Sequence, residues 1–152
     1  MYKSLVQPVV TFGSGSWTLT TEDERRLMTF ERRVSRSIYG PVRLENGEYR
    51  IRWNHELRDL FPGPDVIGSI KSGRIRWLGH VLRADDDRMV KRALDSKPDG
   101  SRPRGRPRIR WIDDVQDDLE SLGHRNTWRS IVGDRTKYRR FVEDAKLLHG
   151  AL

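Results

Sequence analysis

The segment at residues 95–107 constrains the fold most, because it contains three prolines and two glycines. Each proline fixes its own backbone, lacks an amide hydrogen and restrains the preceding residue, so the segment suits neither a helix nor a central strand. Helix-like patterns occur on both sides of it. The sequence therefore predicts a mainly α protein with two small groups of short helices, joined by an extended linker rich in Arg, Pro and Gly.

The clearest helix pattern lies between Thr20 and Gly40. Apolar residues at positions 27, 30, 34 and 38 recur at spacings of three and four, as one face of an α-helix requires. Thr20 or Thr21 can cap the start, where acidic residues suit the helix dipole. Gly40-Pro41 is a typical helix stop.

Other elements are predicted from similar signals. An Asn-Gly pair at residues 46–47 favours a tight turn and predicts one small hairpin near residues 43–53. Caps and apolar stripes predict further helices, which we expect at residues 54–60, 65–82, 90–94, 108–122 and 134–149.

The net charge of +8 is concentrated in one segment. Residues 71–111 hold 13 Lys and Arg against 5 Asp and Glu, whereas the remaining residues hold 17 of each. Cations placed on phosphates release counterions, so this charge favours RNA or DNA as the partner. No stretch is apolar enough to span a bilayer, and neither a signal peptide nor a cysteine is found. We expect an intracellular protein, nuclear or cytoplasmic, with neither a membrane nor a small-molecule substrate as partner.

Every even position from 102 to 110 is an arginine. Alternate residues of an extended chain point the same way, about 6.6 Å apart, so five guanidinium groups could follow a phosphate backbone. The run Arg104-Gly105-Arg106-Pro107 also matches the core of an AT-hook, which lies in the minor groove of DNA. An AT-hook-like DNA-binding protein is therefore the alternative, and a preference for A·T-rich duplex would distinguish it.

Acidic clusters give no catalytic or metal site in this sequence. The DDVQDD run at residues 113–118 lacks a histidine or glutamate at a suitable spacing, and we interpret it as an acidic outer helix face with pairs such as Arg110–Asp114. Ala84-Asp85-Asp86 resembles a polymerase carboxylate turn, but its flanks are charged and helical. The four histidines are scattered. We predict no catalytic residue, no metal and no cofactor.

The tetrapeptide Arg-Ile-Arg-Trp occurs three times, at residues 50–53, 74–77 and 108–111. An apolar residue follows each tryptophan by four positions, which predicts a tryptophan buried beside it at a helix start with the arginines outside. Core packing is favoured over base stacking for these tryptophans, and coincidence in an arginine-rich chain is the other interpretation.

Several motifs occur in a fixed order along the chain. They include PVVTFGS at residues 8–14, FERR at 30–33, IYGP at 38–41, RIRWLGHV at 74–81 and GRPRxRWxDDVxxDL at 105–119. Together they resemble the C-terminal tail of endonuclease–reverse transcriptase polyproteins from animal non-LTR (LINE-type) retrotransposons. The resemblance covers residues 2–150. One departure is Gly15, where the family usually has a glutamate.

The resemblance implies a division of the chain into a thumb-like remnant at residues 1–40, a helical segment at 41–94, a basic linker at 95–107 and a helical segment at 108–152. The catalytic palm would be absent, so the isolated chain would be no enzyme, and the palm would be its missing packing partner. The tail would grip template RNA or target DNA. The contacts implied by position are Arg74, Arg76, His80, Arg102, Arg104, Arg106, Arg108 and Arg110. The alternative is a decayed open reading frame without function.

Overall fold

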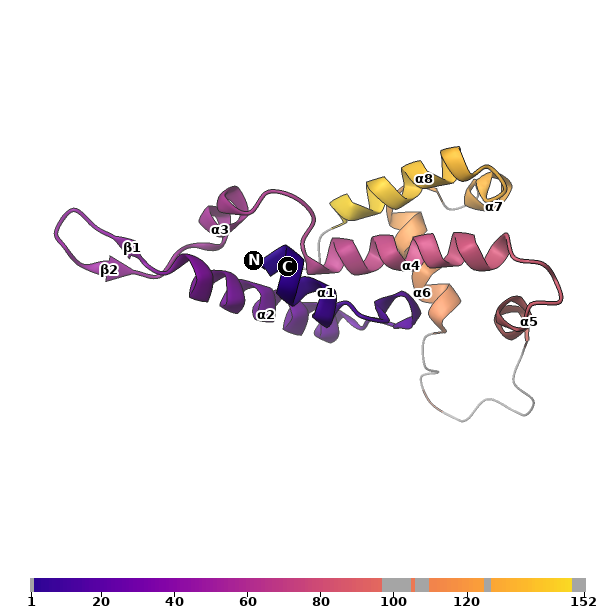
Figure 1. The fold of residues 1–152 in the computed structure, drawn as a ribbon, viewed down its shortest axis with the longest axis horizontal. Helices are drawn as coiled ribbons and strands as arrows, with labels where there is room; N and C mark the ends of the chain where they lie inside the picture. The colour runs from indigo at the N-terminus through magenta and orange to yellow at the C-terminus, as the bar shows by residue number, and fades with distance from the viewer. Residues whose placement is uncertain (1, 97–104, 106–109, 125–126, 149–152) are drawn as a thin grey trace.

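The computed structural model describes residues 2–96, 105, 110–124 and 127–148, and these residues are mainly helical, as predicted. Figure 1 shows the long helices α2 and α4 with shorter helices around α4. The helical elements are η1 (Tyr2–Val6, a π-helix), α1 (Gln7–Val10), η2 (Ser14–Ser16, 3-10), α2 (Thr21–Tyr39), α3 (Asn54–Leu60), α4 (Val66–Leu82), α5 (Met89–Asp95), α6 (Trp111–Ser121), α7 (Trp128–Ile131), α8 (Arg135–Asp144) and η3 (Ala145–Leu147, 3-10).

Helix α2 begins and ends where the sequence predicts. Thr20 and Asp23 form a reciprocal capping box, in which the Asp23 amide donates to the Thr20 hydroxyl at 3.2 Å and the Asp23 carboxylate accepts from the Thr20 amide at 3.1 Å. Gly40 follows the last residue with φ 67°, a conformation that favours glycine. Only part of the apolar stripe is covered, since Phe30 and Ile38 remain exposed.

The predicted hairpin is confirmed. Strands β1 (Val42–Arg43) and β2 (Tyr49–Arg50) pair antiparallel, with Val42 opposite Arg50 and Arg43 opposite Tyr49. Gly47 has φ 85° in the connecting turn, as the Asn-Gly signal requires. The hairpin extends from the end of α2, away from α6, α7 and α8 (Figure 1).

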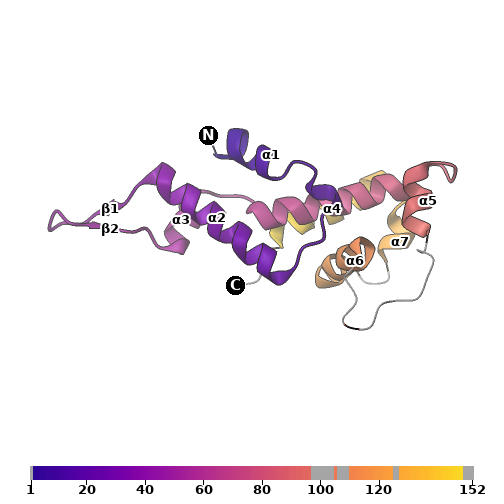
Figure 2. The same cartoon turned by 90° about the horizontal axis from the view of Figure 1, so that it is seen from below.

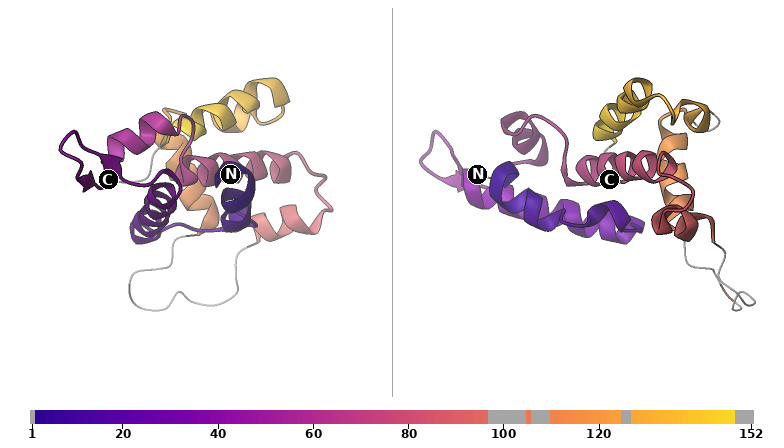
Figure 3. Two further views of the ribbon diagram at one scale, coloured as in Figure 1. Left: turned by 60° about the vertical axis from the view of Figure 1, so that its left-hand side comes forward. Right: turned by 45° about the vertical axis from the view of Figure 1, so that its right-hand side comes forward.

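Helix α4 lies at the centre of the structure. Asp65 caps it, accepting a hydrogen bond from the Gly68 amide at 2.7 Å. Helices α6 and α8 both pack against α4. Figure 2 shows α1 and α6 on opposite sides of α4, and Figure 3 shows α8, in yellow, on the side of α4 away from α2. No helix within the described ranges is long and apolar enough to cross a membrane.

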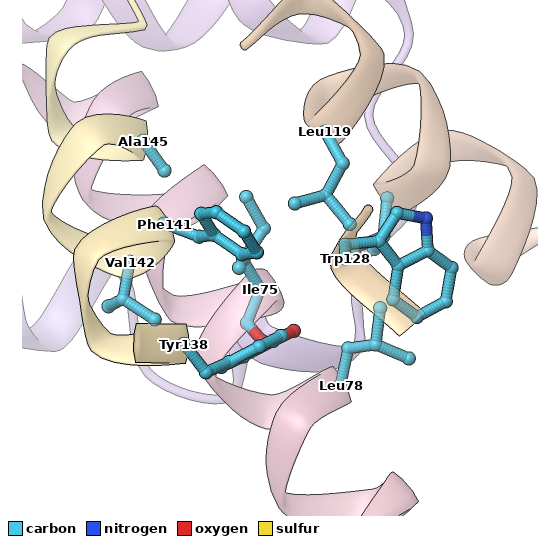
Figure 4. Packing of buried hydrophobic residues seen from close by; sticks show 9 residues of the cluster. Ile75, Leu78, Leu119, Trp128, Tyr138, Phe141, Val142 and Ala145 are labelled. Atoms are coloured by element: carbon cyan, nitrogen blue, oxygen red, sulfur yellow. The ribbon is translucent and has the colours of Figure 1, made fainter. Parts of the chain in front are cut away.

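Two apolar clusters share this helix. The first joins α4 to the segments after the linker and is shown in Figure 4; its buried members are Ile75, Leu78, Val115, Leu119, Trp128, Tyr138, Phe141, Val142 and Ala145. The second joins the start of α4 to the N-terminal segments through Leu19, Val66, Ile67 and Ile70. Both clusters include residues of α4, so the segments before and after the linker pack on the same helix.

Two glycines of α4 allow close approach of the C-terminal segments. A Cβ at Gly79 would lie 2.3 Å from Cε1 of Tyr138, and a Cβ at Gly68 would lie 2.6 Å from the Lys146 carbonyl oxygen. The glycine of the RWLGHV motif thus has a packing role, because only a bare backbone lets the Tyr138 ring lie against α4.

Candidate nucleic-acid interface

A basic groove of about 1270 Å³ lies between α4 and α8, with the η2 segment at its border. We call it the α4–α8 groove. Its charged lining comprises five Lys and Arg residues, one histidine and a single carboxylate, which are Arg76, His80, Arg83, Arg135, Arg139, Lys146 and Glu143. Gly13, Gly15 and Gly73 line it with backbone, so a ligand could approach the main chain there.

The α4 side of the groove follows from helical spacing. Arg76, His80 and Arg83 are four and three residues apart, so they share one face of the helix. The rings of Trp77 and His80 stack with centroids 5.2 Å apart and planes at 27°. Trp77 is 41% exposed, which leaves part of its ring open to a ligand in the groove.

The α8 side contributes Arg135 and Arg139, one helical turn apart, and η3 adds Lys146. Lys146 binds Glu143 at 2.6 Å, and this hydrogen bond holds the pKa of Glu143 below its ordinary value. Arg139 and then Arg76 lower the same pKa further through their charges. The two arginines come from different helices and act on one carboxylate, so the positive charges of both walls converge.

Two buried hydrogen bonds set the spacing of the walls. The Ser72 hydroxyl donates to the Val142 carbonyl at 2.8 Å, and the Tyr138 hydroxyl donates to the Ile75 carbonyl at 2.9 Å. Burial raises the pKa of Tyr138 to about 12, so this donor stays protonated at neutral pH. The groove is therefore built on a rigid contact between α4 and α8.

Arg74, one of the predicted contacts, lies elsewhere. Its side chain is fully buried, with Nη2 2.6 Å from Oδ2 of Asp114 and Nη1 3.5 Å from Oδ2 of Asp118. Arg74 therefore forms ion pairs with both carboxylates, but the geometry of its guanidinium nitrogens does not meet that of hydrogen bonds. The burial of Arg74 argues against the predicted contact with nucleic acid, because the phase of α4 turns this residue toward α6 and its charge is already compensated.

The same cluster corrects half of the interpretation of the DDVQDD run, in which Asp113 and Asp117 are exposed as predicted. Asp114 and Asp118 point inward to α4 instead of forming an outer acidic face, and Asp114 pairs with Arg74 rather than with Arg110. Asp114 also accepts the Leu19 amide at 2.9 Å. The run therefore connects α6 to α4 and to the segment before α2.

Lys71 completes this buried cluster. Its ammonium lies 2.9 Å from Glu24 of α2 and 3.2 Å from Asp118. Burial by itself lowers the pKa of Lys71, but Asp118 and Glu24 outweigh that effect and the net pKa is raised. Burial raises the pKa of Asp118, and Lys71 and Arg74 offset only part of the increase. We call these residues, with Arg74 and Asp114, the buried charge cluster.

The structure places the other predicted contacts as follows. Arg76 and His80 lie in the α4–α8 groove. Arg110 is exposed just before α6 and lines a separate hollow with Lys91 and Arg129. The predictions for Arg102, Arg104, Arg106 and Arg108 fall outside the described residues, as does most of the linker at 95–107.

The three RIRW copies occupy different settings. Residues 50–53 precede α3, residues 74–77 lie within α4, and in the third copy the described residues Arg110 and Trp111 stand at the start of α6. Trp53 and Trp77 are exposed, so the prediction of burial is wrong for both. The residue four positions after each tryptophan is buried in every copy, namely Leu57, Val81 and Val115. The prediction that all three copies stand at helix starts is therefore wrong for the second copy, which lies within α4.

Sequence reasoning missed Arg83, Arg135, Arg139 and Lys146. A signal existed, because Arg135 and Arg139 border the apolar stripe of α8 at helical spacing. Nothing in the sequence shows which helix that border faces. Within the described ranges, no group of three or more His, Cys, Asp or Glu side chains could hold a metal ion.

Comparison with known proteins gives one informative match. No family model matches the chain, and no solved structure gives a significant match. The chain is 25% identical over 143 residues to a Caenorhabditis elegans protein described as an uncharacterized transposon-derived protein. The match covers 91% of this chain and 51% of that protein, so the chain spans about half its length. This similarity indicates a transposon-related origin.

Proposed function

We propose that the chain is a non-catalytic, nucleic-acid-binding part of a retrotransposon protein, and that the α4–α8 groove is its contact surface. The observation that carries the proposal is the charge of this groove, in which five Lys and Arg residues face one glutamate. Phosphate neutralisation is the dominant source of affinity for nucleic acids, and converging guanidinium groups bind phosphates through paired donors.

Three arginines of the groove are available for this role. Among the described residues, no carboxylate lies at ion-pair distance from Arg76, Arg135 or Arg139, although Glu143 is close enough for its pKa to respond to two of them. Arg83 is partly engaged, since it donates to the Val132 carbonyl at 3.0 Å. The exposed ring of Trp77 adds a flat surface suited to sugars and bases.

The arginines at 102, 104, 106 and 108 remain a second proposed contact. They lie on the chain that connects α5 to Arg110 at the start of α6. Their alternation at every second position suits an extended phosphate backbone, and they would add to the affinity supplied by the groove. Replacing Arg104, Arg106 and Arg108 with alanine is expected to weaken binding and to reduce its salt dependence.

The transposon-related similarity and the motif order support a reverse transcriptase as the parent protein. In that proposal the parent supplies polymerase and endonuclease chemistry, while this part holds template RNA or target DNA.

A binding assay tests the groove. A fluorescently labelled duplex and a labelled single strand of equal length are titrated with the parent chain and with Arg76→Ala/Arg139→Ala. We expect the double variant to bind both probes more weakly, because it removes one unpaired cation from each wall. Arg25→Ala/Arg33→Ala removes the same charge from the exposed surface of α2 and serves as the matched control. Equal binding by the two double variants would contradict the assignment of the groove.

A further inference from the structure

The chain after the hairpin turn carries an exposed aromatic stripe. In residues 49–53 exposed and half-buried side chains alternate, and Tyr49, Ile51 and Trp53 are 67%, 74% and 62% exposed. Alternate residues of an extended segment line one face, about 6.6 Å apart. The three side chains therefore form one apolar stripe about 13 Å long, which we call the hairpin stripe.

The intervening arginines secure this arrangement from the opposite face. Arg50 forms a two-pronged contact with Glu56 at 2.9 and 2.5 Å, and Arg52 donates to the Gly40 carbonyl at 3.0 Å. Arg36 donates to the Arg52 carbonyl at 3.2 Å. The stripe is thus held in its extended form by bonds that leave its outward side chains uncovered.

Positive charge surrounds the stripe. A groove of about 750 Å³ beside Trp53 is lined by four arginines and a histidine and by no carboxylate among the described residues, namely Arg36, Arg50, Arg52, Arg58 and His55. Arg36 and Arg52 donate to neutral oxygens, so their charges are not cancelled. Arg43 stands directly opposite Tyr49 in the hairpin and shares its face.

We propose that the hairpin stripe binds a single-stranded stretch of nucleic acid, with unpaired bases stacked on Tyr49 and Trp53 and phosphates on Arg43 and Arg58. The proposal rests on the proposed function and adds the class of strand that this second surface accepts. Flat rings among cations match a polyanion whose base faces are open, whereas a duplex buries its base faces. A partner protein with an apolar surface would leave the surrounding arginines without counter-charges.

The test uses the full chain and three fluorescein-labelled probes, which are a 12-nucleotide oligodeoxythymidine, the matching oligouridine and a hairpin duplex DNA. Tyr49→Ala/Trp53→Ala should bind the single strands about 10-fold or more weakly and bind the duplex as the parent does. Trp53→Phe should retain most of the affinity because it keeps a stacking ring. Phe12→Ala removes an aromatic side chain of the N-terminal segment that is even more exposed than Tyr49 and Trp53, and it is the control. The oligodeoxythymidine and oligouridine arms show whether DNA or RNA is preferred.

The outcomes separate this inference from the proposed function. If the parent binds no probe, the proposed function fails and the inference fails with it. If Arg76→Ala/Arg139→Ala weakens all binding but Tyr49→Ala/Trp53→Ala leaves the single strands unaffected, only the inference is overturned. If Tyr49→Ala/Trp53→Ala lost equal affinity for the duplex and for the single strands, base stacking on the hairpin stripe would be overturned. If the parent chain is a dimer and Tyr49→Ala/Trp53→Ala dissociates it, a second copy covers the stripe. That result would also overturn the inference.

Discussion

The two faces of α4 use the same kind of residue in opposite ways. On the inner face, the buried Arg74 and the half-buried Lys71 pair with carboxylates from α2 and α6. On the outer face, two residues further along, Arg76 points into the α4–α8 groove. A count of charges treats these residues alike, but the helix phase decides which charge holds the fold and which is available to a ligand.

The difference also changes the meaning of the basic segment at residues 71–111. Part of its positive excess is cancelled in space by Glu24, Asp114 and Asp118, which lie outside that segment in the sequence. Conversely, Arg135 and Arg139 come from a charge-balanced region and reinforce the groove. The binding surface therefore follows the fold rather than the linear charge distribution.

The largest effect is expected from Arg74→Ala. Removing this guanidinium leaves Asp114 without its ion-pair partner and Asp118 with Lys71 alone, and breaking a buried pair from one side costs about 3–5 kcal/mol. Urea denaturation followed by circular dichroism measures the loss in the free energy of unfolding. A loss below about 1 kcal/mol would show that the buried charge cluster stabilises the fold no more than an exposed ion pair does.

Gly79→Ala tests the contact that holds the groove walls together. The new methyl would overlap the Tyr138 ring, and overpacking of this kind costs about 1–3 kcal/mol. Gly73→Ala is the control on the same helix, because nothing lies within 4 Å of its Cβ position, and alanine there should stabilise the helix by up to about 1 kcal/mol. Equal effects in thermal unfolding would contradict the close approach of α8.

Acid should loosen the junction between the hairpin and α3. The hydrogen bond from Arg50 lowers the pKa of Glu56 from 4.5 to about 2, with a further contribution from the Trp53 amide. The folded state therefore binds this proton less tightly than the unfolded state, so the stabilisation is complete above pH 4.5 and is lost as the pH falls toward 2. The contribution of Asp118 to the pH dependence of stability has the opposite sign, because burial raises its pKa and the folded state binds this proton more tightly.

NMR titration of the Glu56 carboxyl group, with Glu56→Gln as the reference, measures this effect. A midpoint near the ordinary glutamate value would show that the pair with Arg50 does not persist in solution.

The smallest effect on stability is expected from Arg76→Ala. This exposed residue forms no ion pair within the described residues, and surface substitutions of this kind change the free energy of unfolding by less than about 0.5 kcal/mol. The same denaturation experiment, run beside Arg74→Ala, gives the most direct contrast between the two faces. Comparable losses for the two arginines would remove the distinction.

Much of the local structure is predictable from the sequence. Thr20, Gly40, Asp65 and Asp134 act through neighbouring residues, so the caps and stops are visible without a fold. The hairpin follows from Asn-Gly in the same way. The predictions of these elements are correct because the residues that determine each of them lie within a few positions in the sequence.

The site is less predictable because it depends on which helix faces meet. Arg74 and Arg76 differ only in the angle at which they leave α4, and the partner that buries Arg74 lies forty residues later, at Asp114. Trp53 and Trp77 are exposed although the sequence predicts them in the core. A hydrophobic side chain does not by itself show whether another helix packs over it. Long-range packing, rather than local preference, decides these positions.

The salt dependence of binding tests the central claim most directly. The slope of log K against log salt concentration is measured on duplex DNA for the parent, for Arg76→Ala/Arg139→Ala and for the control Arg25→Ala/Arg33→Ala. If the groove holds phosphates, the first double variant lowers the magnitude of the slope by about 2 and the control retains the parent slope. Identical slopes for all three proteins would show that the α4–α8 groove does not bind nucleic acid.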